Sequence, residues 1–354
     1  MGRARRARKV AAAAAFGGGG VTALGALGVG VMALEMKLAR RTIGTPFGAA
    51  RPDADGVYGA GAGEPIELAV LGDSSAAGLG ADLPEHAPGA VVARGLAAVS
   101  GRAVRLTTVA VVGAVSADLA GQLDRLLDEV RPGVVPDAVI IMVGANDVTH
   151  RVRPAVAVRH LAQTVERLVD LGCQVVVGTC PDLGTIEPVP QPLRLIARRL
   201  SRDLAAAQTV SAVEAGARTV SLGDLLGDEF RRVPAEMFSA DRFHPSSAGY
   251  AAAARAMLPS VAAALGYWPD GGAERLPDAR RGEGIGPITV AAVASAADPG
   301  TEVSATEVAG EQRGPRGRWA VLRRRRQEPA EASPATEDGS NETQVTATTS
   351  PTAE

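Results

Sequence analysis

Four polar residues stand in short segments that end apolar runs of the sequence. Ser74 lies in Gly-Asp-Ser, Asn146 in Gly-Ala-Asn-Asp, and Asp241 and His244 in Asp-Arg-Phe-His-Pro. A serine hydroxyl is a weak nucleophile until a base takes its proton, and histidine suits that task near neutral pH. Asp241 precedes His244 by three residues in a turn-forming segment, close enough to hold the other imidazole nitrogen. These residues predict a catalytic triad of Ser74, His244 and Asp241.

Attack of such a serine on an ester carbonyl creates an oxyanion, which needs hydrogen-bond donors already in place. We expect three donors: the Asn146 side-chain amide and the main-chain N–H groups of Gly113 and Ser74. Ser74 also falls at a strand-to-helix turn, where the positive end of the helix dipole favours negative charge. The adjacent Ser75 is expected in the first turn of that helix and is not expected to take part in catalysis.

Each segment taken alone has an ordinary structural explanation. Gly-Asp-Ser can be a turn with serine as N-cap, Gly113 a turn glycine, and Gly-Ala-Asn-Asp an Asx turn. The catalytic interpretation depends on all of them falling at one edge of one sheet. The other histidines are not expected to be catalytic. His86 and His160 have no nearby carboxylate of suitable placement, and we expect His150 to be structural.

Short β-branched runs alternate with amphipathic helical stretches between residues 65 and 268. Strands that are apolar on both faces and separated by helices predict a parallel sheet covered on both sides. We therefore predict an α/β fold, a three-layer α/β/α sandwich with a five-stranded parallel sheet. Ligands bind outside the carboxyl ends of the strands in such sheets, where the polar segments fall. The expected strands are 66–71, 104–111, 138–143, 174–179 and 219–222, and the expected helices include 116–130, 155–172, 192–217 and 246–266.

These segments, in this order, resemble the conserved blocks of the SGNH hydrolases, also called the GDSL esterase/lipase family. The stretch GTCPDLG at 178–184 is also similar to one seen in many members. The resemblance spans about residues 66–266 and implies a flavodoxin-like SGNH fold and a serine esterase that forms an acyl-enzyme. It implies the following site residues: the nucleophile Ser74, the triad members Asp241 and His244, and the oxyanion-hole residues Ser74, Gly113 and Asn146.

The resemblance leaves the substrate open, because the family includes arylesterases, thioesterases, lysophospholipases and carbohydrate deacetylases. The catalytic segments fill a domain of only about 200 residues, which leaves little material for a large lid. We therefore expect an open, shallow site for short or medium acyl chains or acetyl groups. The partner would be a small-molecule, lipid or carbohydrate ester. An acyltransferase and a membrane-tethered protein that binds an envelope glycan or lipid are the alternatives.

The N-terminus combines a basic segment, residues 1–9, with an uncharged run of 25 residues, 10–34. That length fits a membrane-spanning helix of about 20 residues. Five positive charges precede the run and three soon follow it, which favours a single-pass protein of the cell membrane with its hydrolase domain, 65–268, outside. A cleaved signal peptide and secretion are the alternative, and the many glycines and alanines make the run weakly hydrophobic.

The segments on either side of the hydrolase domain are rich in Gly, Pro and Ala. We expect residues 35–64 to be a linker and 269–354 a mostly disordered tail, in which only 288–294 resembles a strand. The arginine-rich segment 313–326 could dock on anionic lipid or be a solvated charge run.

Composition and motifs limit the other classes of partner. A formal net charge of −2 gives no global attraction for nucleic acid, so no nucleic-acid partner is expected. No HExxH, CxxC or GxGxxG signature is present, so we expect neither a metal nor a cofactor. Cys173 and Cys180 flank a predicted strand, which puts their Cα atoms roughly 20 Å apart, too far for a disulfide.

Overall fold

The computed structural model describes residues 34, 35, 38, 41, 44, 46–48, 51–267, 307, 308, 311 and 312 of the chain. All of them belong to the first of two compact units, Met1–Pro315. Most of the uncharged run, the expected strand at 288–294 and the arginine-rich segment lie outside the described residues. Within the described residues, no helix combines the length and the hydrophobicity needed to cross a membrane.

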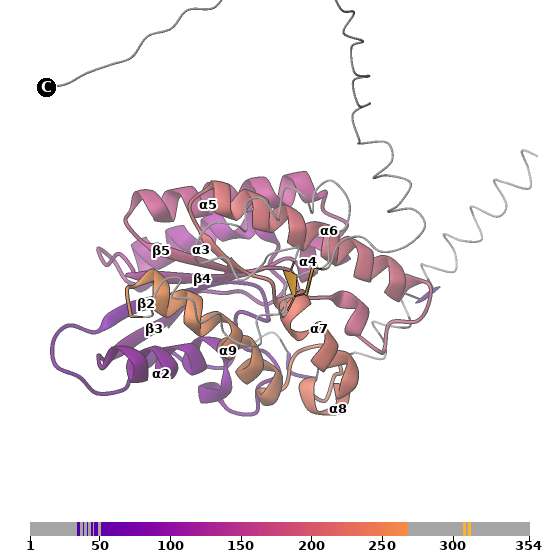
Figure 1. Ribbon diagram of the computed structural model, residues 1–354, viewed down its shortest axis with the longest axis horizontal. Helices are drawn as coiled ribbons and strands as arrows, with labels where there is room; N and C mark the ends of the chain where they lie inside the picture. The colour runs from indigo at the N-terminus through magenta and orange to yellow at the C-terminus, as the bar shows by residue number, and fades with distance from the viewer. Residues whose placement is uncertain are drawn as a thin grey trace, which may run out of the picture. The chain divides into compact units, whose positions relative to one another are not determined.

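A six-stranded sheet in the order β1-β3-β2-β4-β5-β6 forms the middle layer (Figure 1). Five strands are parallel, as predicted, and β1 pairs antiparallel with β3 at one edge. The predicted number of five strands is therefore wrong by one. The extra strand lies within residues 35–64, the expected linker, and its three residues are too few to give a periodic pattern. The strands are β1 (Gly56–Tyr58), β2 (Ile66–Gly72), β3 (Val104–Thr108), β4 (Ala138–Met142), β5 (Gln174–Gly178) and β6 (Arg218–Val220).

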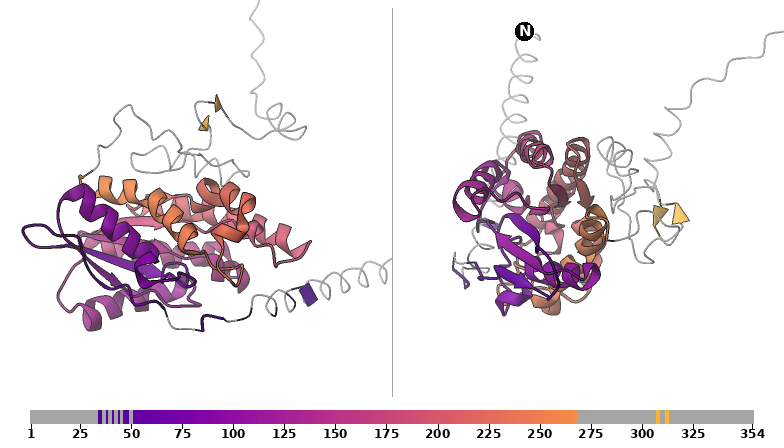
Figure 2. Two further views of the ribbon diagram at one scale, coloured as in Figure 1. Left: turned by 90° about the horizontal axis from the view of Figure 1, so that it is seen from below. Right: turned by 90° about the vertical axis from the view of Figure 1, so that its left-hand side faces the viewer.

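Helices cover both faces of this sheet, so the predicted three-layer sandwich is confirmed (Figures 1 and 2). One face packs against α2 (Pro88–Ser100) and α9 (Ser247–Ala264), and the other against α3 (Leu119–Arg125), α5 (Pro154–Asp170) and α6 (Leu193–Glu214). The remaining elements are α4 (Ala145–Thr149), α7 (Leu222–Arg232), α8 (Pro234–Met237), η1 (Pro84–His86), η2 (Ser116–Asp118), η3 (Leu126–Val130) and η4 (Leu183–Thr185). A separate antiparallel pair comprises β7 (Glu307–Val308) and β8 (Glu311–Gln312).

The central strands are buried on both faces, and this fixes their register. In β2, Leu68 and Val70 point into the core on the α2–α9 side, whereas Ala69 and Leu71 point into the core on the α3–α5 side. A slip of one residue would exchange the two faces, so the packing strongly specifies the pairing. The residues that follow β2 and β4 are consequently held at defined positions at the carboxyl edge of the sheet.

Candidate active site

The structure brings Ser74, His244 and Asp241 together, although 170 residues separate the serine from the histidine. His244 Nε2 lies 3.0 Å from Ser74 Oγ. His244 Nδ1 lies 2.6 Å from Asp241 Oδ2. One imidazole therefore links a serine hydroxyl to a carboxylate, which is the geometry in which histidine can accept the hydroxyl proton.

The position of Ser74 depends on a tight turn at the end of β2. Gly72 has φ +136°, and a Cβ at this position would lie 1.8 Å from the Met142 carbonyl oxygen, so only glycine fits. Asp73 N–H donates to the same Met142 oxygen at 3.0 Å. Five residues after Ser74, the N–H of Leu79 donates to the Ser74 carbonyl oxygen at 3.0 Å, which closes the turn. The nucleophile candidate thus sits on a fixed strand-to-turn junction.

Asp241 is buried, and every contact of its carboxylate fixes the histidine loop. Its Oδ1 accepts hydrogen bonds of 2.9 Å from the N–H groups of Phe243 and His244 and from Ser239 Oγ. Burial alone would raise the pKa of Asp241, but the hydrogen bonds from His244 and Phe243 and the charge of His244 outweigh it and lower the pKa. The carboxylate is therefore ionised and aligned with His244 Nδ1.

The two other predicted oxyanion donors lie on a short helix and on the loop that contacts it. Asn146 is at the start of α4, and its Nδ2 donates to the Ala114 carbonyl oxygen at 3.0 Å. Gly113 immediately precedes Ala114 and has φ +88°. Asn146 lines the same cavity as Ser74 and His244, whereas Gly113 is not among the lining residues.

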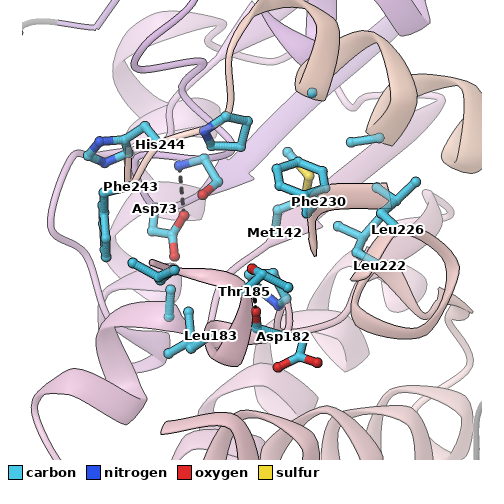
Figure 3. A pocket seen from close by; sticks show the side chains of 18 of the residues that line it. Asp73, Met142, Asp182, Leu183, Thr185, Leu222, Leu226, Phe230, Phe243 and His244 are labelled. Atoms are coloured by element: carbon cyan, nitrogen blue, oxygen red, sulfur yellow. Dashed lines mark hydrogen bonds between the residues drawn. The ribbon is translucent and has the colours of Figure 1, made fainter. Parts of the chain in front are cut away.

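An apolar cavity of about 90 Å³ adjoins Ser74 and His244. Figure 3 shows Phe243 beside His244, with Phe230, Leu226 and Leu222 on the far side of Asp73. Sequence analysis did not predict which residues line this cavity, because they are of the same apolar types as the core. Its wall includes Met142, Leu183, Ile186, Leu222, Leu226, Phe230, Phe238 and Phe243.

One wall of the cavity is held by a buried carboxylate in the stretch 178–184. Asp182 Oδ2 lies 3.0 Å from Arg231 Nη1, 3.4 Å from Arg198 Nε and 3.6 Å from Arg202 Nε. Its Oδ1 accepts the Gly184 N–H at 2.8 Å. Because these arginines come from α6 and α7, Asp182 joins η4 to both helices and fixes the wall.

Asp73 is a buried titratable group beside the nucleophile candidate that the sequence did not single out. Its Oδ1 accepts the Ser75 N–H at 2.9 Å. Burial raises the pKa of Asp73 from 3.8 to about 6, and the Ser75 hydrogen bond and the charge of His244 partly oppose that rise. The only sequence signal for this residue was its place in the Gly-Asp-Ser segment.

A second group of His, Ser and Asp lies at the start of α9, with a different arrangement. His86 Nδ1 is 3.1 Å from Ser247 Oγ, and Ser247 Oγ donates to Asp82 Oδ2 at 2.6 Å. The hydroxyl here lies between the imidazole and the carboxylate, so the carboxylate does not orient the histidine. The group joins the segment after Ser74 to α9 and lacks the order of a triad.

The remaining candidate groups have structural positions. His150 Nδ1 is 2.8 Å from the Asn146 carbonyl oxygen. Cys173 and Cys180 do not form a disulfide, as predicted, and both are buried. Among the described residues, no three His, Cys, Asp or Glu side chains gather in a way that could hold a metal ion.

Comparisons with known proteins cover the same region. Residues 70–252 match the profile of the GDSL-like Lipase/Acylhydrolase family. The chain is 44% identical over 226 residues to the GDSL-like esterase Rv1075c of Mycobacterium tuberculosis, an alignment that covers 61% of this chain and 71% of that protein. Similar solved structures include TesA (24% identity, 56% of this chain and 99% of that one, TM-score 0.44) and a variant acetyl xylan esterase from Geobacillus stearothermophilus (23%, 59% and 97%, 0.42). The family match begins within β2 and ends within α9, so it includes every residue of the candidate site.

Proposed function

The chain belongs to the GDSL-like lipase/acylhydrolase family and is a carboxylic ester hydrolase, and from this premise we propose that it works through an acyl-enzyme on Ser74. The observation that carries the proposal is the continuous contact of Ser74 Oγ, His244 and Asp241, at 3.0 and 2.6 Å. The burial of Asp241 and its three further hydrogen bonds support its assignment as the residue that orients the imidazole.

In the proposed first step, Ser74 Oγ attacks the ester carbonyl carbon while His244 Nε2 takes the hydroxyl proton. Asp241 stabilises the imidazolium through Nδ1. His244 then gives the proton to the leaving alkoxide as the C–O bond breaks, which leaves the acyl group on Ser74. Water attacks this acyl-enzyme in the second step with His244 as base, and proton return to Ser74 Oγ releases the carboxylic acid.

Charge develops on the carbonyl oxygen in both steps. The proposed donors to this oxygen are the N–H groups of Ser74 and Gly113 and the side-chain amide of Asn146. The position of Asn146 on the cavity lining supports this assignment, together with the Ala114 contact that fixes its amide group. Donors fixed in advance stabilise the transition state without reorganising during the reaction.

The apolar cavity is the proposed site for the acyl group. Its volume of about 90 Å³ is well below the roughly 300–1,000 Å³ of pockets for drug-sized ligands, which favours short over long acyl chains. A panel of p-nitrophenyl esters from acetate to palmitate tests this assignment. We expect the highest kcat/KM between two and eight carbons, and a maximum at twelve or more would contradict it.

The same panel with an added alcohol acceptor distinguishes hydrolysis from acyl transfer. We expect the free acid to remain the main product, because the proposed second step uses water. If most of the acyl group appeared as a new ester, the protein would be a transferase. The Ser74→Ala variant is the control for both assays, since it removes the hydroxyl that forms the acyl-enzyme.

A further inference from the structure

Asp147, the residue after Asn146, is buried on α4, and its carboxylate accepts three hydrogen bonds from Ser116. Ser116 N–H lies 3.2 Å from Oδ1 and 3.1 Å from Oδ2, and Ser116 Oγ donates to Oδ2 at 2.9 Å. Ser116 is itself only 1% exposed. Because Ser116 follows Gly113 by three residues, this contact joins α4 to the loop that carries a proposed oxyanion donor.

A second contact between α4 and this loop lies close by. Asn146 Nδ2 donates to the Ala114 carbonyl oxygen at 3.0 Å. Two consecutive α4 residues therefore each hold one residue of the loop: Asn146 binds Ala114, and Asp147 binds Ser116. At its other end the loop is tied to the nucleophile strand, because Val111 N–H donates to the Gly72 carbonyl at 3.1 Å.

Gly113 lies in a tight turn that is closed by a hydrogen bond of 3.1 Å from Ala114 N–H to the Val111 carbonyl oxygen. It has no side chain, its φ is +88°, and no atom lies within 4 Å of the place where a Cβ would be. The direction of its N–H therefore depends on this turn and on the anchors that hold the loop on either side of it. On the C-terminal side these anchors are the Asn146–Ala114 and Asp147–Ser116 contacts.

We propose that Asp147 is a positioning residue of the oxyanion hole, which through Ser116 fixes the Gly113 N–H relative to the Asn146 amide. This inference rests on the proposed function. Hydrogen bonds from N–H and O–H groups to a carboxylate are charge-assisted and about twice as strong as neutral ones. A misplacement of about 1 Å in a catalytic group can cost roughly 100-fold in rate, so this anchor controls kcat.

The test compares Asp147→Asn with the same substitution at an exposed aspartate at the opposite edge of the sheet. Asp147→Asn keeps the size of the side chain, but it removes the charge and places an NH2 group where one oxygen accepts from Ser116. Asp137→Asn is the control, because Asp137 Oδ2 also accepts a main-chain N–H from another element, that of Glu67 at 2.8 Å. The measured quantities are kcat and KM for p-nitrophenyl butyrate and the free energy of unfolding in urea.

We expect Asp147→Asn to lower kcat by about 10- to 100-fold and to change KM less than about threefold. Asp137→Asn should leave kcat within about twofold of wild type. Ser116→Ala removes one of the three hydrogen bonds and should lower kcat by a few-fold. This variant decides the question if Asp147→Asn does not fold.

A double-mutant cycle separates positioning from a general loss of stability. In an Asn146→Ala background the donor relative to which Asp147 positions the Gly113 N–H is gone, so Asp147→Asn should lower kcat by less than about threefold. An equal loss in both backgrounds, or a folded Asp147→Asn variant with wild-type kcat, would overturn the inference. Failure of the proposed function is a separate result, because it would appear as ester hydrolysis by Ser74→Ala.

Discussion

Gly80 lies where the segment that follows Ser74 meets the histidine loop, and its replacement by alanine should damage the active site. Its φ is +101°, a conformation that residues with a side chain rarely adopt. A Cβ at this position would lie 2.9 Å from the Pro245 carbonyl oxygen and from Ser239 Oγ, and 3.0 Å from His244 Cβ. An alanine would therefore strain its own backbone and also push directly on the histidine.

The size of the effect follows from these distances. Ordinary contacts of a Cβ begin near 3.4 Å, so the neighbours must move by about half an ångström. The His244 Nε2 to Ser74 Oγ distance is 3.0 Å, near the long end of the range of about 2.6–3.2 Å for proton transfer. We predict a loss in kcat of at least about 10-fold, and a loss of about 1–3 kcal/mol in the free energy of unfolding from backbone strain.

Gly172→Ala is the matched control for this variant. Gly172 has φ +91°, but nothing lies within 4 Å of its Cβ position, so an alanine there is strained without pushing on a neighbour. We expect a similar loss of stability, measured by urea denaturation, and a kcat within about twofold of wild type. A wild-type kcat in Gly80→Ala, or an equal loss of activity in Gly172→Ala, would show that the contact with the histidine loop does not control the rate.

Three further predictions address other parts of the site. Asn146→Ala should lower kcat by about 10²- to 10³-fold in steady-state ester hydrolysis, since it removes an oxyanion donor, and a loss below about threefold would exclude that role. Folded Asp73 keeps its proton up to about pH 6 whereas the unfolded chain releases it near pH 3.8, so the free energy of unfolding falls as pH rises through this window. Asp73→Asn lacks this titration, so its free energy of unfolding should rise by about 3 kcal/mol relative to that of wild type between pH 3 and pH 7 in urea titrations. Parallel curves of unfolding free energy against pH for the two proteins would contradict the raised pKa of Asp73. Leu226→Trp should fill the far end of the cavity and lower kcat/KM for octanoate about tenfold relative to acetate, with Leu171→Trp, at an exposed site, leaving the ratio unchanged.

Much of the site was predictable because its chemistry is concentrated in short contiguous segments. Ser74 follows Gly-Asp at the end of a β-branched run, and Asp241 and His244 lie three residues apart. The alternation of strands and helices then puts these segments at one edge of a parallel sheet. Local pattern and sheet topology together bring the residues into contact, although neither gives the distances between them.

The features that sequence reasoning missed depend on contacts between distant segments. The Asp147–Ser116 contact joins residues 31 positions apart, and no pattern marks Ser116 as its partner. Asp182 binds arginines on two helices that follow it, and arginine is abundant along this chain. The cavity could not be predicted from the sequence either, because an apolar residue such as Phe230 can line a cavity or fill a core equally well.

Covalent labelling is the direct test of whether Ser74 is the nucleophile. Wild-type protein treated with a fluorophosphonate and mapped by peptide mass spectrometry should carry one modification, on Ser74, in proportion to lost esterase activity. Ser75→Ala should label at the wild-type rate, because it retains the N–H that Asp73 accepts, whereas Ser74→Ala should neither label nor hydrolyse esters. A label on another residue, or esterase activity near wild type in Ser74→Ala, would show that Ser74 is not the nucleophile.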